Sequence, residues 1–519
     1  MQTATPEHQD TSALRARHAS EGGSAPYSAR QIVGWIVGPT ILLLTLLLPP
    51  PHGLSIQGWR TVGAAGLMAV FWMAESIPIP VTALLPLALF PLLGLGDIRQ
   101  SAAPFANPII YLFYGGFVLA LAMQRWGLHR RVAISLLSRV GTRPAAIVGG
   151  FLLASAVTSM WVSNTATALM MLPIASSVIQ LLPRNNASTV DAPFGTAVAL
   201  SVAYGATTGG MATLIGTPPN ALLAGYVSDV YGFEIGFGRW MLLGVPMMLI
   251  ALPAVHLVLT RIMFRLPKGE LPGMRAMLEA ERAKLGPLNR GEFVVAMVFT
   301  LTAVAWVLQP VIAQRLPMLS DTTIAMMGAI ALFMIPVSGR RVEFVMSWET
   351  ARDIPWGVLL LFGGGLSLAD NIERHGVSRF LGDLAGGMIG VPVLLVLCVV
   401  CFGILMLTEL TSNTATAATF LPITAALAIT LGQNPLLFVI PTALAASCSY
   451  MLPVGTPPNA IVYGSGLVTL PQMARAGVLL NILLVPILVG LVLALGPVVF
   501  GIHIDTVPGW ALVTQGGHR

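Results

Sequence analysis

The chain has 519 residues, of which 55% are hydrophobic and 9% are charged, whereas soluble proteins have about 25% charged residues. With a mean hydropathy of +0.82, this composition excludes a water-soluble globular protein and predicts a chain that crosses a membrane many times. The net charge of +6 comes from Lys and Arg in the segments between apolar runs. That pattern is typical of cytoplasmic loops and does not indicate nucleic-acid binding.

Apolar runs recur along the chain, and about 20 apolar residues are enough to cross a bilayer. We predict eleven full crossings, at 33–50, 61–77, 79–95, 108–124, 192–213, 239–264, 292–314, 322–338, 355–370, 436–453 and 473–499. Two further apolar stretches, 144–182 and 392–431, have polar centres that disfavour a single crossing, and we predict re-entrant helical hairpins there. The predicted fold class is therefore an all-α polytopic membrane protein. The polar residues 1–30 should form a flexible cytoplasmic N-terminus, and residues 500–519 a C-terminal tail.

Three connecting segments are rich in Lys and Arg: residues 125–143, residues 261–290, and a stretch with Arg340, Arg341 and Arg352. The positive-inside rule places such segments in the cytoplasm. With eleven crossings and all three segments inside, the N-terminus is cytoplasmic and the C-terminus is extracytoplasmic. We predict a multi-pass protein of the inner cell membrane in this orientation.

Two polar motifs each occur twice, in the same order, inside this apolar chain. Ser-Asn-Thr-Ala-Thr-Ala occupies 163–168 and 412–417, and Gly-Thr-Pro-Pro-Asn-Ala occupies 216–221 and 455–460. The offset between copies is 249 residues for the first motif (413 − 164) and 239 for the second (455 − 216). An ordered pair of duplicated motifs indicates one composite site built from two related halves.

The duplication divides the chain into two repeats, which we place at 57–264 and 291–499. A first transmembrane helix at 31–56 precedes them, and the basic cytoplasmic loop 265–290 joins them. If the hairpins re-enter, each repeat contributes five full crossings, and this odd number inverts the second repeat relative to the first. The two Ser-Asn-Thr motifs would then meet near the membrane midplane, an arrangement typical of secondary transporters.

The motifs supply the groups that an anion and a small cation need. A hairpin with Ser-Asn-Thr at its tip begins its second helix there, so that backbone N–H groups and the positive end of the helix dipole point into a cavity. The Pro-Pro pair lacks backbone donors and breaks a span, which frees carbonyl groups for a cation. No Lys, Arg or His lies within or immediately beside a motif. Because two helix N-termini supply only about half a charge each, we expect bound Na⁺ to complete a site for a dianion.

The paired Ser-Asn-Thr and Gly-Thr-Pro-Pro-Asn motifs resemble those of the divalent-anion:sodium symporter family, which carries C4-dicarboxylates, citrate or sulfate. The resemblance covers residues 57–499. It implies eleven transmembrane helices plus two re-entrant hairpins, arranged as a scaffold domain and a transport domain that moves by an elevator-type slide. It also implies a homodimer.

The resemblance further implies which residues bind the ions and the substrate. One sodium site should use Ser159, Ser163, Asn164 and Gly216, and the other Thr408, Ser412, Asn413 and Gly455. The substrate carboxylates should contact Asn164, Thr165, Thr217, Asn413, Thr414 and Pro457.

We therefore expect a secondary active transporter that imports succinate, fumarate or malate with Na⁺. Two alternatives within the family are a sodium-independent dicarboxylate exchanger and a citrate or sulfate transporter. A channel or an enzyme is disfavoured, and for an enzyme no HExxH, GxSxG or clustered His or Cys ligands accompany the polar motifs. Glu409, three residues before Ser412, is either a hydrogen-bonded structural carboxylate, which we favour, or a proton carrier.

Overall fold

The computed structural model describes residues 28–181, 191–267, 269–337, 343–384, 387 and 390–512. Within these ranges the regular secondary structure is helical, apart from one isolated β-bridge between Pro336 and Phe344, which confirms the all-α prediction. Most of the predicted N-terminal segment, part of the C-terminal tail, and Arg340 and Arg341 lie outside the described residues.

The first half of the chain begins with a run of apolar helices and then forms the first hairpin. Its helices are α2 (Ala29–Leu47), α3 (Ile56–Ala74), α4 (Ile79–Leu93), α5 (Ile98–Ala102), η1 (Ala103–Ala106), α6 (Pro108–Arg125), α7 (Leu128–Leu137), α8 (Pro144–Ser159), α9 (Asn164–Ile179), α10 (Asp191–Gly210), α11 (Pro218–Tyr231) and α12 (Phe237–Leu257), which continues as a π-helical turn, η2 (Val258–Met263).

The second half repeats this order after a connecting helix. Its helices are α13 (Met274–Lys284), α14 (Arg290–Ile312), α15 (Asp321–Met334), α16 (Trp348–Ala351), α17 (Trp356–Arg374), α18 (Val377–Leu384), α19 (Val393–Thr408), α20 (Asn413–Thr430), α21 (Pro435–Ser447), α22 (Pro457–Gly464), α23 (Leu470–Phe500) and α24 (Gly509–Leu512).

Each of the eleven apolar runs predicted to cross the membrane lies for the greater part on a helix. By length and apolarity, six described helical stretches qualify as membrane spans, and six shorter apolar helices accompany them. The two stretches with polar centres form pairs of helices, α8 with α9 and α19 with α20, and the members of each pair pack against each other. Interrupted helices of this kind are expected where backbone lines a protein-enclosed cavity.

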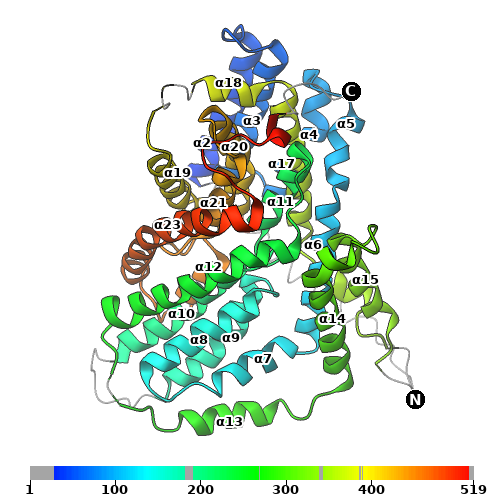
Figure 1. The fold of residues 1–519 in the computed structure, drawn as a ribbon. Helices are drawn as coiled ribbons and strands as arrows, with labels where there is room; N and C mark the ends of the chain where they lie inside the picture. The colour runs from blue at the N-terminus through cyan, green and yellow to red at the C-terminus, as the bar shows by residue number, and fades with distance from the viewer. Residues whose placement is uncertain are drawn as a thin grey trace, which may run out of the picture.

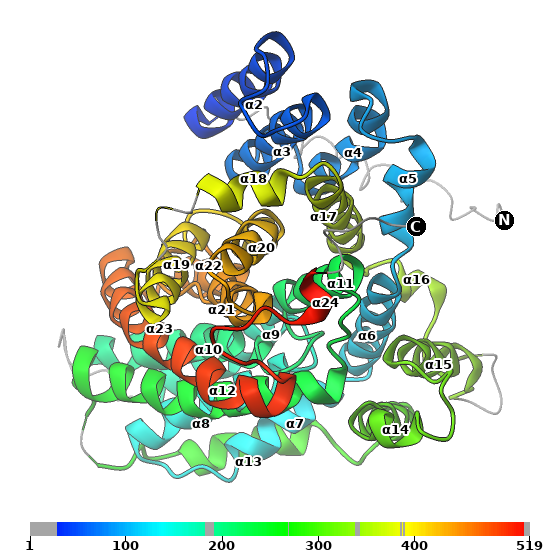
Figure 2. The ribbon, with the colours of Figure 1, turned by 45° about the horizontal axis from the view of Figure 1, so that its top comes forward.

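Helices α10, α11 and α21 are largely buried and pack against helices of the two hairpins, and Figure 1 shows α11 and α21 near the middle of the molecule. Helix α10 packs closely on α8 because Gly205 and Gly209 face its backbone, so that a methyl group on Gly209 would collide with Ala156. Small residues permit such close approach of helices inside a membrane. Helices α12 and α23 lie side by side across the middle of the molecule, and α20 lies between α18 and α21 (Figure 2).

The second helix of each hairpin packs against a helix of the other repeat. Helix α9 of the first hairpin packs against α22, and α20 of the second hairpin packs against α11. Each hairpin therefore contacts the other repeat.

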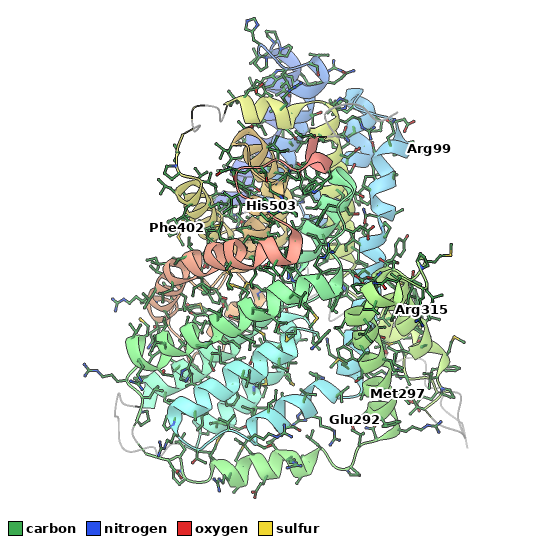
Figure 3. All side chains as sticks on the ribbon, viewed as in Figure 1. Arg99, Glu292, Met297, Arg315, Phe402 and His503 are labelled. Atoms are coloured by element: carbon green, nitrogen blue, oxygen red, sulfur yellow. The ribbon has the colours of Figure 1, made fainter. Side chains whose placement is uncertain are left out.

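The basic segments that were predicted to share one side of the membrane lie together. Arg130 of α7 pairs with Glu281 of α13 at 2.9 Å, and Arg131 pairs with Glu292 of α14 at 2.9 Å. The indole Nε1 of Trp126 donates to the Val345 carbonyl oxygen at 2.8 Å, which joins the third segment to the other two. Figure 3 shows Glu292 near the α13 end of α14 and Arg315 beyond the opposite end.

Candidate cation and anion site

The first hairpin turns at the Ser-Asn-Thr motif, as predicted. Helix α8 ends at Ser159 and α9 begins at Asn164, with Ser163 as the N-cap residue. The Ser163 hydroxyl accepts from the Ala166 N–H at 3.3 Å, and the Ser159 hydroxyl donates to Asn164 Oδ1 at 2.5 Å. The N–H groups of Asn164 and Thr165 open α9 and have no intrahelical acceptor, so the tip combines oxygen ligands with donors for an anion.

The first Gly-Thr-Pro-Pro-Asn motif ends an interruption between α10 and α11. Helix α10 ends at Gly210, and Pro218 starts α11 at a position where a missing N–H costs nothing. Thr213 holds the bend, because its hydroxyl donates to the Met160 carbonyl oxygen at 2.6 Å and accepts from the Gly216 N–H at 3.0 Å. The Asn220 side-chain amide donates to the Thr213 carbonyl oxygen at 2.8 Å.

The tip of the first hairpin meets this interruption. A methyl group on Gly210 would lie 2.8 Å from Asn164 Oδ1 and 3.1 Å from the Gly216 carbonyl oxygen. Three of the four residues predicted for one sodium site, Ser159, Asn164 and Gly216, thus lie together, and Ser163 caps the same turn. Their hydroxyl, amide and carbonyl oxygens are the hard, neutral ligands that suit a small monovalent cation. In the described part of the chain, no group of three His, Cys, Asp or Glu side chains forms a site for a more highly charged metal.

The second hairpin repeats this geometry with different side chains. Helix α19 ends at Thr408 and α20 begins at Asn413. The Thr408 hydroxyl contacts Asn413 Oδ1 at 2.7 Å and the Ala446 carbonyl oxygen at 2.7 Å. Ser412 occupies the N-cap position without a side-chain capping bond, so its hydroxyl, unlike that of Ser163, is not engaged at the helix start.

The second interruption runs from the end of α21 at Ser447 to the start of α22 at Pro457. Thr456 caps α22 by accepting from the Asn459 N–H at 3.4 Å. The Asn459 amide donates to the carbonyl oxygens of Ser449 at 3.2 Å and Leu452 at 3.1 Å. In the first repeat, Thr217 holds the equivalent cap position without such a side-chain bond and is 2% exposed.

The asparagines of the Gly-Thr-Pro-Pro-Asn motifs have a role that the sequence interpretation missed. Asn220 and Asn459 are fully buried, and the side-chain amide of each donates hydrogen bonds to carbonyl oxygens of its own interruption. The signal was present in the sequence, since both copies of the motif contain this asparagine. We interpret them as residues that hold the broken backbone in shape.

The two interruptions contact each other in the core. The Tyr204 hydroxyl of α10 donates to the Tyr450 carbonyl oxygen at 2.8 Å, and Thr208 contacts the Tyr450 hydroxyl at 3.0 Å. Met211 and Cys448 place their sulfur atoms 3.4 Å apart. Together with the contacts of α9 with α22 and of α20 with α11, this packing connects the two repeats next to their interruptions.

Glu409 is a buried carboxylate in the turn of the second hairpin, with 2% of its surface exposed. Both of its oxygens accept hydrogen bonds, from the Ser449 hydroxyl, the backbone N–H groups of 450–452 and the Asn481 side chain, at 2.7–3.1 Å. A carboxylate with every neighbour donating has no free position for a mobile proton. The geometry therefore favours the structural role over the proton carrier.

Comparisons with known proteins agree with this architecture. The family model described as the sodium:sulfate symporter transmembrane region matches residues 30–502. The sodium-dependent dicarboxylate transporter SdcS of Staphylococcus saprophyticus is 40% identical over 486 residues, which cover 92% of this chain and 94% of that protein. SdcS of Staphylococcus aureus strain USA300 is 40% identical over 488 residues, with the same shares of each chain covered.

Two solved structures share the fold at low sequence identity. The YdaH transporter of Alcanivorax borkumensis has a TM-score of 0.56 and 14% identity, with 90% of this chain and 99% of that chain covered. MtrF of Neisseria gonorrhoeae, described with a class of antimetabolite efflux pumps, has a TM-score of 0.52 and 11% identity, with 92% and 97% covered.

Proposed function

The chain belongs to the sodium:sulfate symporter family, and from this premise we propose that it imports C4-dicarboxylates together with sodium ions. The observation that carries the proposal is the pair of half-sites, in each of which the turn of a hairpin contacts the interruption that precedes a proline-started helix. The family resemblance drawn from the four motifs is confirmed, and the protein is a multi-pass membrane transporter. Its relatives of 40% identity are named for sodium-dependent dicarboxylate transport.

Each half-site supplies one sodium site in this proposal. Oxygens of Ser159, Ser163, Asn164 and Gly216 bind one ion, and oxygens of Thr408, Ser412, Asn413 and Gly455 bind the other. The two ions and the two helix N-termini then offset the charge of a dianion, which the family's substrate residues contact: Asn164, Thr165, Thr217, Asn413, Thr414 and Pro457. Sodium binding thereby lowers the free energy of anion binding, and the reverse holds by linkage.

The movement proposed for this site is an elevator-type slide of the hairpin-bearing part against a scaffold of the remaining helices, within a homodimer. The proposed orientation puts α7 and α13 in the cytoplasm. The convergence of the three basic segments on one end of the molecule supports a common side for them.

Transport in reconstituted vesicles tests the proposal. Purified full-length protein in proteoliposomes should accumulate labelled succinate when an inward sodium gradient is imposed, and replacement of Na⁺ by choline should abolish accumulation. Unlabelled fumarate and malate should compete, and the degree of competition by citrate and sulfate measures selectivity. Uptake that ignores sodium but needs internal dicarboxylate would replace symport by exchange.

Substitutions at the tips test the site. Asn164→Ala and Asn413→Ala should each abolish uptake, because each removes a predicted ligand shared by the ion and the anion. Asn371→Ala, at a buried asparagine of α17 outside the site, serves as the matched control and should retain uptake. Normal uptake by either tip variant would refute the site assignment.

A further inference from the structure

The two half-sites differ in what holds their interrupted backbone. In the first repeat a neutral hydroxyl, that of Thr213, links the hairpin turn to the interruption. In the second repeat Leu452 stands in the position equivalent to Thr213, and Glu409 stands where the first repeat has Met160 (213 + 239 = 452; 160 + 249 = 409). In the second repeat a carboxylate, and not a hydroxyl, therefore links the hairpin turn to the interruption.

The carboxylate organises the segment that leads to Gly455. Glu409 Oε1 accepts from the N–H groups of Tyr450 at 2.7 Å and Met451 at 3.0 Å, and Oε2 accepts from the N–H of Leu452 at 3.1 Å. Asn481 of α23 donates to Oε1 at 2.9 Å. Since three consecutive backbone N–H groups, those of residues 450–452, point at Glu409, one carboxylate orients these peptide groups.

This charge lies next to the second half-site. Glu409 follows Thr408 directly, and a methyl group on Gly455 would lie 3.1 Å from Glu409 Oε2. No Lys, Arg or His of the described residues forms an ion pair with Glu409. A buried carboxylate without an opposite charge beside it has a high electrostatic free energy in a membrane protein, even when it accepts hydrogen bonds. A nearby cation lowers that free energy.

We propose that Glu409 is the fixed counter-charge and positioning residue of the second-repeat sodium site, which for this reason binds Na⁺ more tightly than the first-repeat site and fills first, before the anion. Around the first half-site, the described neighbours Met160, Gly210 and Thr213 offer only neutral groups, so its ion gains less from the protein and more from the incoming dianion. The inference rests on the proposed sodium-coupled function and adds an order of binding to it.

The order can be measured by titrating Na⁺ alone. The thermal unfolding of full-length protein in detergent is followed against NaCl, with choline chloride holding the ionic strength constant and with no dianion present. Wild-type protein should show a sodium-specific rise in Tm that begins at low Na⁺. If Na⁺ stabilises no more than choline, the proposed function itself fails, whatever Glu409 does.

Glu409→Gln should raise the Na⁺ concentration at the midpoint of this titration at least about tenfold, because the charge is lost. The decisive variant is Glu409→Gln with Asn481→Asp, which exchanges the carboxylate and the amide between facing positions. It restores one negative charge beside the site and gives the new amide at position 409 a carboxylate to donate to. The double variant should bring the midpoint back to within about threefold of wild type. A residue that only supported the fold would change Tm without moving the sodium midpoint.

Two ligand substitutions test the order without altering Glu409. Thr408→Ala should raise the sodium midpoint measured without anion, whereas Ser159→Ala should leave it unchanged and reduce only the further stabilisation seen when succinate is added. The proposal is overturned if Ser159→Ala shifts the anion-free midpoint as much as Thr408→Ala does. It is also overturned if folded Glu409→Gln protein titrates like wild type, or if the double variant folds without recovering sodium affinity.

Discussion

The close contact between α8 and α10 gives a direct way to displace the first half-site without touching a ligand. Gly209 of α10 faces Ala156 of α8, and a methyl group at Gly209 would lie 2.5 Å from the Ala156 Cα and would collide with its carbonyl oxygen. Ala156 is three residues before Ser159, and Gly209 directly precedes Gly210, which borders Asn164 and Gly216. The substitution Gly209→Ala therefore moves the two walls of the site apart.

The size of the displacement follows from ordinary packing distances. Carbon atoms in contact are about 3.5–4.0 Å apart, so α8 and α10 must separate by about 1 Å. Binding groups need to stay within about 0.5 Å of their productive positions, which means that Ser159 can no longer join Asn164 and Gly216 around one ion. The strain costs about 1–3 kcal/mol, and the gain of about 1 kcal/mol in helix propensity offsets part of it. The protein should still fold.

Sodium-driven succinate uptake, and the sodium titration of Tm with succinate present, measure the outcome. Gly209→Ala should reduce uptake at a fixed subsaturating Na⁺ concentration at least about tenfold, which corresponds to about 1.4 kcal/mol. Gly490→Ala is the matched control, because it is also a helical glycine and its new methyl group would meet nothing within 4 Å. If Gly209→Ala protein transports like Gly490→Ala protein with an unchanged sodium dependence, the reasoning that ties this contact to the site is wrong.

Two further predictions concern packing around the second half-site and on the basic face. Gly455→Ala should lower both uptake and Tm, because the methyl group would collide with the Ser449 hydroxyl; adding Ser449→Gly, which copies the first repeat, should recover a measurable part of both, and no recovery would contradict the steric explanation. Arg131→Gln should reduce the stability measured by thermal unfolding by about 3 kcal/mol, since it leaves the carboxylate of Glu292 buried without its partner. Arg130→Gln should cost clearly less because its partner keeps a second cation, and equal losses would refute the argument.

The Lys284 ammonium is that second cation. The pH sets whether the carboxylate of Glu281 is ionised, and therefore whether its two ion pairs contribute to stability. The hydrogen bond from Lys284 to Glu281, together with the Arg130 guanidinium, holds the pKa of the Glu281 carboxyl below its usual value. A depressed pKa contributes stability above the usual carboxyl range and loses it as the pH falls. The pair is therefore intact at neutral pH, where the two arginine variants are to be compared.

The tips of the hairpins could be predicted from the sequence because local chemistry determines them. A serine followed by Asn-Thr is a helix N-cap pattern, and the structure starts α9 at Asn164 and α20 at Asn413. The starts of α11 and α22 follow from the same kind of signal, because Pro218 and Pro457 fit the first turn of a helix but not its interior. The residues that carry the proposed site were therefore recognisable without any knowledge of tertiary contacts.

The places where the first halves of the interrupted helices end could not be predicted with the same ease. Proline does not mark them, since Pro246 and Pro253 lie inside α12, whereas α10 ends at Gly210, before any proline. The end of α10 depends instead on the long-range bond from the Thr213 hydroxyl to the Met160 carbonyl oxygen of the hairpin turn. Such bonds become visible only when the hairpin and the interruption are placed side by side.

The sequence motifs likewise predict which residues bind the ions but not the order in which the ions bind. Duplicated motifs identify equivalent ligands in the two halves, and for equivalent ligands alone both ions would bind with the same free energy. The difference comes from residues outside the motifs, since Glu409 and Asn481 have no counterparts of the same chemistry in the first repeat. A carboxylate held by backbone donors attracts a nearby cation by the Coulomb interaction in a low-dielectric interior, without coordinating it directly. An inverted repeat can thus keep two nearly identical binding geometries and still fill them in sequence, provided that one fixed charge lies behind only one of them.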